Sequence, residues 1–150
     1  MQEAIALAED GVNSNRGGPF GAVIVKDNQI ISRGNNRVTS SNDPTAHAEI
    51  TAIRAACEKL NTFSLQGCEI YTSCEPCPMC LSAIYWARIE HIYYAATQFD
   101  AAKIGFDDQF LYEEMNKSLD QRKIPTRQCC RDEALSVFAA WENKTDKVLY

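Results

Sequence analysis

The 150-residue chain lacks any hydrophobic run that approaches the roughly 18 apolar residues of a membrane-spanning helix. It also lacks the basic region that opens a secretory signal, because Glu3, Glu9 and Asp10 interrupt the first apolar segment. Both absences argue against insertion into a membrane and against export. We therefore expect a soluble, cytoplasmic protein that has no membrane partner.

An excess of positive charge is absent as well. The chain has 15 Lys and Arg against 20 Asp and Glu, which gives a formal net charge of -5. Nonspecific affinity for nucleic acid comes mainly from clustered Lys and Arg. The composition therefore favours a small uncharged substrate over a nucleic acid partner.

No internal repeat, low-complexity tract or linker divides the chain, so we expect a single domain over residues 1–150. Apolar periodicity and turn residues predict strands over 20–25, 29–36, 68–72 and 91–96 and helices over 3–13, 45–59, 78–87, 106–115 and 133–143. Thr45 is expected to cap the second of these helices. Strands that alternate with helices indicate an α/β layered domain, in which ligands bind beyond the carboxyl ends of the strands.

The chain has seven cysteines, which we expect to be reduced thiols in a protein that is not exported. Cys77 and Cys80 are three residues apart at the start of a predicted helix, so their sulfurs lie on one side and the helix N-terminus favours thiolates. This spacing predicts a pair of zinc ligands. Four other cysteines are expected to be small buried residues without an assigned role: Cys57, Cys68, Cys129 and Cys130.

Histidine is scarce, and only His47 has suitable neighbours for a third ligand. The second histidine, His91, opens an apolar strand and has no thiol residue beside it. A catalytic zinc site needs three protein ligands and one open position, whereas a structural site has four. His47, Cys77 and Cys80 are therefore predicted to bind zinc, with a closed structural site that adds Cys74 as the alternative.

Glu49 follows His47 by two residues, and two such side chains point about 200° apart within a helix. They converge on one metal only if they lie in the first turn, where Pro44 and Thr45 would place them. Zinc can lower the pKa of bound water from about 15.7 to about 7, and Glu49 can take that proton and return it. This combination predicts hydrolytic removal of an amine from an aromatic ring.

The pattern His47, Ala48, Glu49 followed by the segment 76–80, which reads PCPMC, is the signature of the zinc nucleobase deaminases. With these residues the chain resembles the cytidine and deoxycytidylate deaminase superfamily. It looks most like bacterial guanine deaminases, through "GGPFGAVIVKD", "SNDPTAHAEITAIRAAC", "YTSCEPCPMCLSAIYWAR" and "AATQFDAAKIGFDD". The resemblance implies a three-layer α/β sandwich with a mixed sheet of about five strands and helices on both faces.

The same resemblance implies zinc-dependent conversion of guanine to xanthine and ammonia, with one zinc per subunit in a homodimer and Glu49 as the proton shuttle. It further implies six substrate contacts, at Asn36, Ala48, Asp108, Phe20, Trp86 and Tyr150. Asn36 would bind the base edge and Asp108 would accept ring N–H groups. Phe20 and Trp86 would offer flat walls, and Tyr150 would help to close the site.

Three rival functions stay open on the sequence alone. The first is deamination of another free base or nucleoside, such as cytosine, adenine or an aminotriazine. The second is deamination of adenosine in tRNA, which the net charge argues against. The third is a non-catalytic zinc module, in which Glu49 would have no task.

Overall fold

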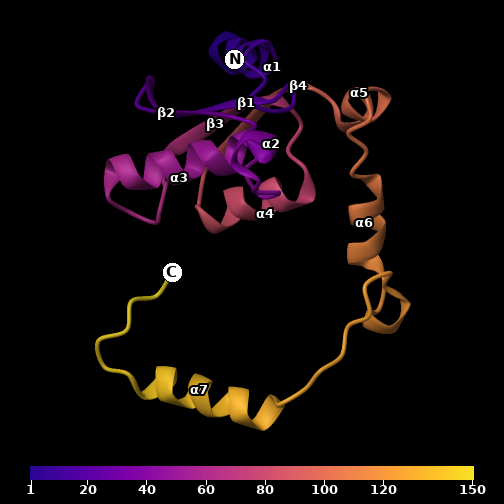
Figure 1. Cartoon of the computed structure of the whole chain (residues 1–150). Coiled ribbons are helices and arrows are strands. Elements are labelled where there is room, and N and C mark those ends of the chain that lie inside the picture. The colour runs from indigo at the N-terminus through magenta and orange to yellow at the C-terminus, as the bar shows by residue number, and fades with distance from the viewer. The chain divides into compact units, whose positions relative to one another are not determined.

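The computed structural model describes residues 1–150 and divides into two compact units, Met1–Asp108 and Gln109–Tyr150. The first unit contains the whole sheet, and the second contains only helices and connecting segments. Figure 1 shows the course of the chain through both units. That the chain works as one domain stays a prediction. None of the helices is long and apolar enough to span a membrane.

The first unit consists of five helices and four strands. In chain order these are α1 (Gln2–Asn13), β1 (Gly21–Lys26), β2 (Gln29–Asn35), α2 (Val38–Ser41), α3 (Ala48–Leu60), β3 (Cys68–Cys74), α4 (Pro78–Trp86), β4 (His91–Ala96) and α5 (Gln98–Lys103). The second unit contains α6 (Gln109–Asn116), the 3-10 helix η1 (Leu119–Gln121) and α7 (Arg131–Asn143).

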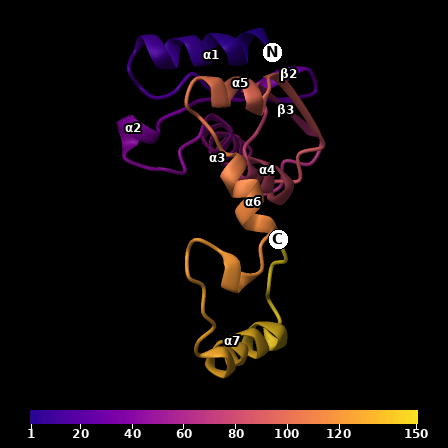
Figure 2. The same cartoon turned by 90° about the vertical axis from the view of Figure 1, so that its right-hand side faces the viewer.

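The sheet has the strand order β2-β1-β3-β4. Strand β1 is antiparallel to both of its neighbours, whereas β3 and β4 are parallel, so the sheet is mixed. Helix α1 lies on one face and α3 and α4 lie on the other (Figures 1 and 2). This is the three-layer α/β arrangement that the sequence predicted. The sheet has four strands, one fewer than the expected number of about five.

The connections between the strands determine where the ligand-binding edge of the sheet lies. Asp27 and Asn28 both have positive φ, at 49° and 60°, which suits the tight turn between β1 and β2. The parallel pairing of β3 with β4 requires a crossover, and α4 supplies it. Because α4 begins just after the carboxyl end of β3, the segment around Cys77 lies at the edge where ligands bind in such sheets.

The core lies between the sheet and α3, where strand β2 and the helix are in direct contact. A Cβ on Gly34 would lie 2.2 Å from the carbonyl oxygen of Ala48, so only glycine allows this approach. The hydroxyl of Ser32 donates to the carbonyl oxygen of Ala52 at 2.7 Å, which satisfies a buried polar group. These contacts therefore fix the distance between strand β2 and the first turns of α3.

Two features of the helices differ from the expectations. The N-cap of α3 is His47 and not Thr45, because the backbone N–H and hydroxyl of Thr45 donate to the carboxylate of Asp43 at 2.8 and 2.7 Å. The helix predicted over 106–115 is present as α6, which begins at Gln109, whereas α5 was not predicted. Thr97 and Asp100 form a capping box that starts α5.

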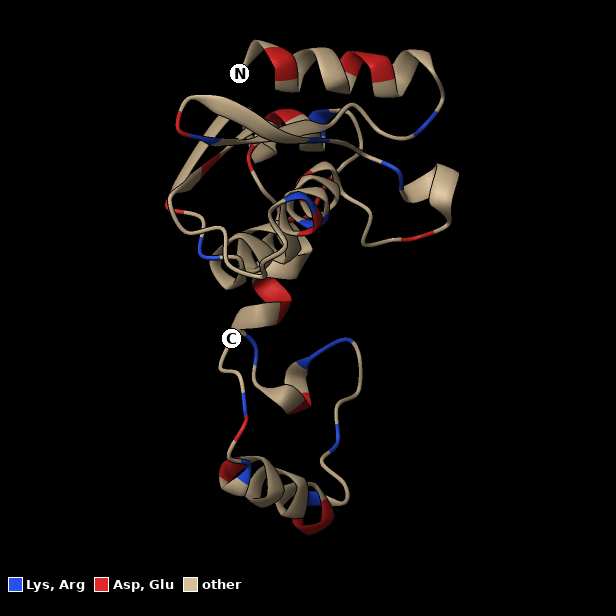
Figure 3. Cartoon of the chain, turned by 90° about the vertical axis from the view of Figure 1, so that its left-hand side faces the viewer, with Lys and Arg blue, Asp and Glu red and all other residues tan.

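The second unit has little burial of its own. Neither α6 nor α7 contains a buried residue. Cys129 and Cys130 are exposed here, which differs from the expected burial, whereas Cys68 is buried and Cys57 is half-buried. The reason is that the segment before α7 has no packed layer beside it within this unit. Acidic and basic residues are interspersed in each unit (Figure 3).

Candidate active site

The ligand-type side chains lie at the N-termini of two helices. His47 is the N-cap of α3 and Cys77 is the N-cap of α4, and both have extended backbone angles, with ψ of 160° and 167°. A residue in this conformation projects its side chain beyond the helix end. Neither side chain makes a capping hydrogen bond to its own helix. Both are therefore available to each other.

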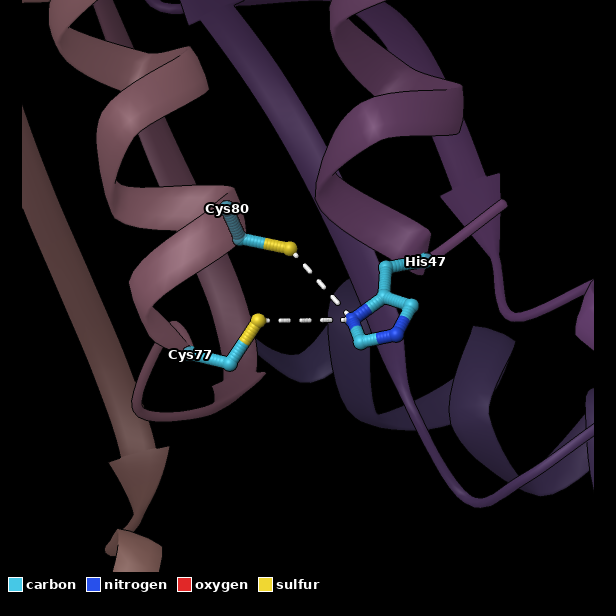
Figure 4. Close-up of side chains that lie close together, drawn as sticks. All are labelled: His47, Cys77 and Cys80. Carbon is cyan, nitrogen blue, oxygen red and sulfur yellow. Dashed lines mark hydrogen bonds between the residues drawn. The ribbon is translucent and has the colours of Figure 1, made fainter. Parts of the chain in front are cut away.

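These side chains meet at one point. The Nδ1 atom of His47 lies 3.5 Å from the Sγ of Cys77 and 3.5 Å from the Sγ of Cys80 (Figure 4). The three ligand atoms all lie within 4.8 Å of one another. Cys74 is not part of this cluster, because its thiol donates to the carbonyl oxygen of Thr97 at 3.6 Å. The structure therefore brings together three donors and not four.

This donor set fits zinc. Two cysteine sulfurs and one imidazole nitrogen are ligands that zinc prefers over harder ions such as magnesium or calcium. A zinc ion held by three protein ligands keeps one open position and lowers the pKa of a water bound there. Cys77, Cys80 and the Nδ1 atom of His47 are the groups that would hold it.

The three ligands differ in how readily they lose a proton. A hydrogen bond from the thiol of Cys80, followed by one from His47, lowers the pKa of Cys77 to about 4. This shift favours the thiolate form of Cys77. The pKa of Cys80 is raised, mainly because its proton is shared with Cys77. The pKa of His47 is also raised, mainly by its hydrogen bond with Cys77, so metal binding at this cluster is expected to release protons.

Glu49 lies in the first turn of α3, two residues after His47, as the spacing argument required. Its exposed fraction is only 7%, and it faces the cavity beside the metal ligands. Burial raises the pKa of its carboxyl group. A carboxylate that holds a proton more readily than usual is suited to proton transfer near neutral pH.

A cavity of about 420 Å³ opens beside Glu49. This volume falls within the roughly 300–1,000 Å³ of small-molecule sites. Among its lining residues are Phe20, Asn36 and Asp108, which the sequence analysis had named as substrate contacts. All of the lining residues belong to the first unit.

Two of these lining residues have defined surroundings. The ring of Phe20 packs edge-to-face against Phe106, with 4.9 Å between centroids. Partial burial raises the pKa of Asp108, and the charge of Cys77 adds to this effect. Phe106 was missed by the sequence analysis, although it lies within the "IGFDD" segment that was quoted for the resemblance.

Two expected contacts of the first unit, Trp86 and Ala48, are not among the lining residues of the cavity. Trp86 is 67% exposed and lies beside Tyr85 and Arg88 on the outer surface of α4. It follows Cys80 by six residues, a rotation of about 240° that turns it away from the ligands. Ala48 is buried in the first turn of α3, where its N–H has no acceptor within the helix. Tyr150 is 72% exposed at the end of the second unit.

The sequence analysis also missed Glu75. This residue lines the cavity, and its Oε2 atom accepts a hydrogen bond from the backbone N–H of Gln98 at 3.1 Å. It thereby ties the start of α5 to the segment between β3 and α4. The signal for Glu75 was its place between Cys74 and Cys77, but a carboxylate next to ligand cysteines was not assigned a task.

Comparison with known proteins agrees with this geometry. The model of the cytidine and deoxycytidylate deaminase zinc-binding region matches residues 1–96. Guanine deaminase of Bacillus subtilis (strain 168) is 57% identical over 150 residues, which are 100% of this chain and 96% of that protein. The crystal structure of guanine deaminase from Bacillus subtilis matches with a TM-score of 0.97 over 99% of this chain and 95% of that chain.

A second relative is similar over a shorter region. The tRNA-specific adenosine deaminase of Aquifex aeolicus (strain VF5) is 51% identical over 78 residues, or 52% of each protein. A structure of guanine deaminase from Nitrosomonas europaea matches with a TM-score of 0.67 and 34% identity, over 71% of this chain and 62% of that chain. The extent of the family match, together with the ligand cluster, shows that this chain belongs to the cytidine and deoxycytidylate deaminase family.

Proposed function

We propose that this protein hydrolyses guanine to xanthine and ammonia, with one zinc ion per subunit. The observation that carries the proposal is the 57% identity with guanine deaminase of Bacillus subtilis over the whole of this chain. The cavity supports it, because a carboxylate, a carboxamide and an aromatic ring line the space beside the metal ligands. These three groups are Asp108, Asn36 and Phe20.

The reaction requires two proton transfers. A water oxygen adds to the ring carbon that carries the amino group, and Glu49 accepts the proton that the water loses. Glu49 passes this proton to the adjacent ring nitrogen, then takes the remaining hydroxyl proton and delivers it to the amino group, which leaves as ammonia. The carboxylate is regenerated at the end of each turnover. Burial of Glu49 keeps bulk water from competing for the proton.

Recognition of the base is assigned to the cavity walls. Asp108 accepts the lactam N–H of guanine, and Asn36 binds another position on the base edge. The ring of Phe20 packs on the face of the base, and the N–H of Ala48 is a further donor. A base that lacks the lactam N–H leaves the partly buried carboxylate of Asp108 without a partner, which disfavours that base.

Ammonia release by the zinc-loaded protein tests the proposal. The panel consists of guanine, guanosine, adenine, cytosine, cytidine and a short tRNA anticodon hairpin. Turnover of guanine above all others is the expected result. Preference for the hairpin would replace the proposal with tRNA adenosine deamination, and preference for another base would retain the chemistry but not the assigned pocket.

The assignment of Asp108 has its own test. Asp108→Asn should reduce kcat/KM for guanine by about 10²-fold or more, because the variant no longer offers a charged acceptor. 2-Aminopurine lacks the lactam N–H and serves as the comparison substrate, for which the loss should be much smaller. Equal losses for both substrates would remove the assigned role.

We further propose that the protein is a homodimer in the cytoplasm. Tyr85 and Trp86 on α4 and Tyr93 and Tyr94 on β4 are large exposed side chains, and exposed apolar groups of this kind mark protein interfaces. A dimer contact is therefore the role that we now assign to Trp86. All seven cysteines are free thiols, which supports a reducing compartment. Light scattering of wild type and Trp86→Arg tests the dimer.

The contribution of Tyr150 to substrate binding stays a prediction. A variant that ends at residue 149 tests it through the KM for guanine. An unchanged KM would remove Tyr150 from the substrate contacts while leaving the other assignments untouched.

A further inference from the structure

The orientation of the Asn36 side chain is determined by two backbone donors. The N–H of Val38 donates to Oδ1 of Asn36 at 3.1 Å, and the N–H of Gly18 donates to the same atom at 3.3 Å. A backbone N–H can only donate, so the acceptor must be the oxygen and not the nitrogen of the carboxamide. Both lone pairs of Oδ1 are therefore used within the protein. Only the Nδ2 group, which is a donor, is left for a ligand.

Gly17 closes the space on the other side of Asn36. A Cβ on Gly17 would lie 2.4 Å from the carbonyl oxygen of Asn36 and 2.5 Å from its Oδ1 atom. Real Cβ atoms do not approach other atoms so closely, so any side chain at this position must displace Asn36. The backbone of Asn36 is held from the opposite side, where its N–H donates to the carbonyl oxygen of Phe20 at 3.0 Å.

Gly18 links this carboxamide to the aromatic wall. Its N–H supplies one of the two donors, and a Cβ at this position would lie 3.0 Å from Cζ of Phe106 and 3.2 Å from the ring of Phe20. Because Gly18 has no side chain, the edge-to-face pair of Phe20 and Phe106 can pack directly against its backbone. Gly17 and Gly18 therefore affect both the position of the Asn36 carboxamide and the packing of the Phe20 ring.

We infer that Gly17 and Gly18 are positioning residues that hold Asn36 with its Nδ2 group toward the base, so that this side of the cavity accepts only a hydrogen-bond acceptor. The inference deepens the proposed function and rests on it. Asp108 offers an acceptor and Asn36 offers a donor, which together complement a lactam whose ring presents one N–H and one unprotonated oxygen or nitrogen. A base with an N–H facing Asn36 is rejected.

The first test is Gly17→Ala, with Gly11→Ala as the matched control. A Cβ on Gly11 would meet only ordinary contacts, at 3.7 Å, in the same part of the first unit. Gly17→Ala is expected to raise the KM for guanine by about tenfold, the effect of losing one well-placed hydrogen bond, with kcat nearly unchanged and zinc retained. Gly11→Ala should change neither parameter. An unchanged KM in Gly17→Ala overturns the inference.

A double-mutant cycle separates positioning from general damage. If Gly17 acts through Asn36, then Gly17→Ala should raise the KM no further in an Asn36→Ala background. Additive effects would mean that Gly17 acts independently, which contradicts the assignment.

Asn36→Asp provides a second variant that avoids the steric change at Gly17. Its carboxylate still accepts from Gly18 and Val38, but it replaces the Nδ2 donor with an acceptor. We expect hydrogen exchange at these two amides to stay as slow as in wild type while the KM for guanine rises at least tenfold. In Gly17→Ala, the same two amides should exchange faster, with the amide of Ile24 in β1 unchanged.

The exchange measurement needs no substrate, so it decides the positioning role even if wild type does not turn over guanine. Inactive wild type with these exchange patterns removes the proposed function and leaves the positioning of Asn36 intact. Unchanged exchange at Gly18 and Val38 in Gly17→Ala, or a normal KM in Asn36→Asp, removes the inference and leaves the proposed function standing.

Discussion

Helices α3 and α7 begin with the same order of residue types but differ in the backbone of the N-cap, which is extended at His47 and left-handed at Cys130, and in their surroundings. Each has 13 residues, a potential metal ligand as the N-cap, and a carboxylate two residues later. These pairs are His47 with Glu49 in α3 and Cys130 with Asp132 in α7. Helix α3 contains five buried residues and α7 contains none. The side chain of Asp132 is 94% exposed, whereas Glu49 is 7% exposed.

The difference shows what a short motif needs in order to become a site. His47 meets Cys77 and Cys80 because the N-terminus of α4 is delivered to the same point by the crossover after β3. Cys130 has no such partners in the ligand cluster. Burial then changes the chemistry, because it raises the pKa of Glu49. A ligand and a carboxylate at a helix start are therefore insufficient without a second element and a low-dielectric environment.

The largest expected effect is the loss of zinc, which should follow replacement of a cysteine in the ligand cluster but not replacement of the N-cap cysteine of α7. Cys80→Ala should reduce zinc from about one per chain to nearly none and abolish turnover, because only two ligands remain. Cys130→Ala should keep both zinc and activity. Metal analysis by mass spectrometry and ammonia release measure the two outcomes. Full zinc occupancy in Cys80→Ala would show that the ligand set is different.

The next effect concerns the two carboxylates. Glu49→Gln should lower kcat by about 10²-fold to 10⁴-fold while zinc stays bound, because the proton carrier is lost but the ligands are not. Asp132→Asn should leave kcat unchanged. Single-turnover kinetics with guanine and parallel zinc analysis check both variants. Substantial activity in Glu49→Gln would favour a non-catalytic task for this residue.

A smaller effect is expected on stability, and it tests whether α7 is uncovered in solution. Ala52 is fully buried in α3, so Ala52→Leu should overpack the core at a cost of about 1–3 kcal/mol. Ala139 is exposed in α7, so Ala139→Leu should change stability by about 0.5 kcal/mol or less. Denaturant unfolding measures both. A cost at Ala139 equal to that at Ala52 would show that another surface covers α7.

The smallest expected effect is a gain in stability that depends on pH. Burial raises the pKa of Glu49, so folded protein holds this proton more tightly than unfolded protein. At low pH, Glu49 is protonated in both the folded and the unfolded protein, so burying it carries no electrostatic cost. This free-energy cost grows as the pH rises through the pKa of Glu49 in the folded protein. In metal-free protein, Glu49→Gln should therefore raise Tm most at high pH.

Asp132→Asn is the control for this measurement, because its side chain is already solvated. Its effect on Tm should not change over the pH range in which the effect of Glu49→Gln grows. A constant difference in Tm between wild type and Glu49→Gln at all pH values would show that Glu49 titrates normally in the folded protein.

Local patterns were sufficient for some features of this protein and not for others. The four strands and the ligand spacing follow from periodicity and from residues that lie close in sequence. The exposed position of Trp86 and the cap of α3 do not follow from such patterns. The direction of Trp86 depends on which face of α4 carries Cys80, and the cap of α3 depends on Asp43 competing for Thr45. Such outcomes depend on packing and on competing hydrogen bonds.

The missed residues show the same limit in the cavity. Phe106 and Glu75 act through contacts with Phe20 and Gln98, which are distant in sequence. Gly17 carries no side chain, so a search for functional groups passes over it. Its importance is visible only in the distances from its backbone to Asn36.

The close approach of Gly34 to the carbonyl of Ala48 has a consequence for how the specificity of this protein can be changed. The turn that carries His47 and Glu49 packs directly on the sheet, so its position is coupled to that of strand β2. The segment 104–108 contributes Phe106 and Asp108 to the cavity from an irregular region beyond α5. Substitutions in that segment are therefore expected to change which ring is bound while leaving the zinc ligands and Glu49 in place.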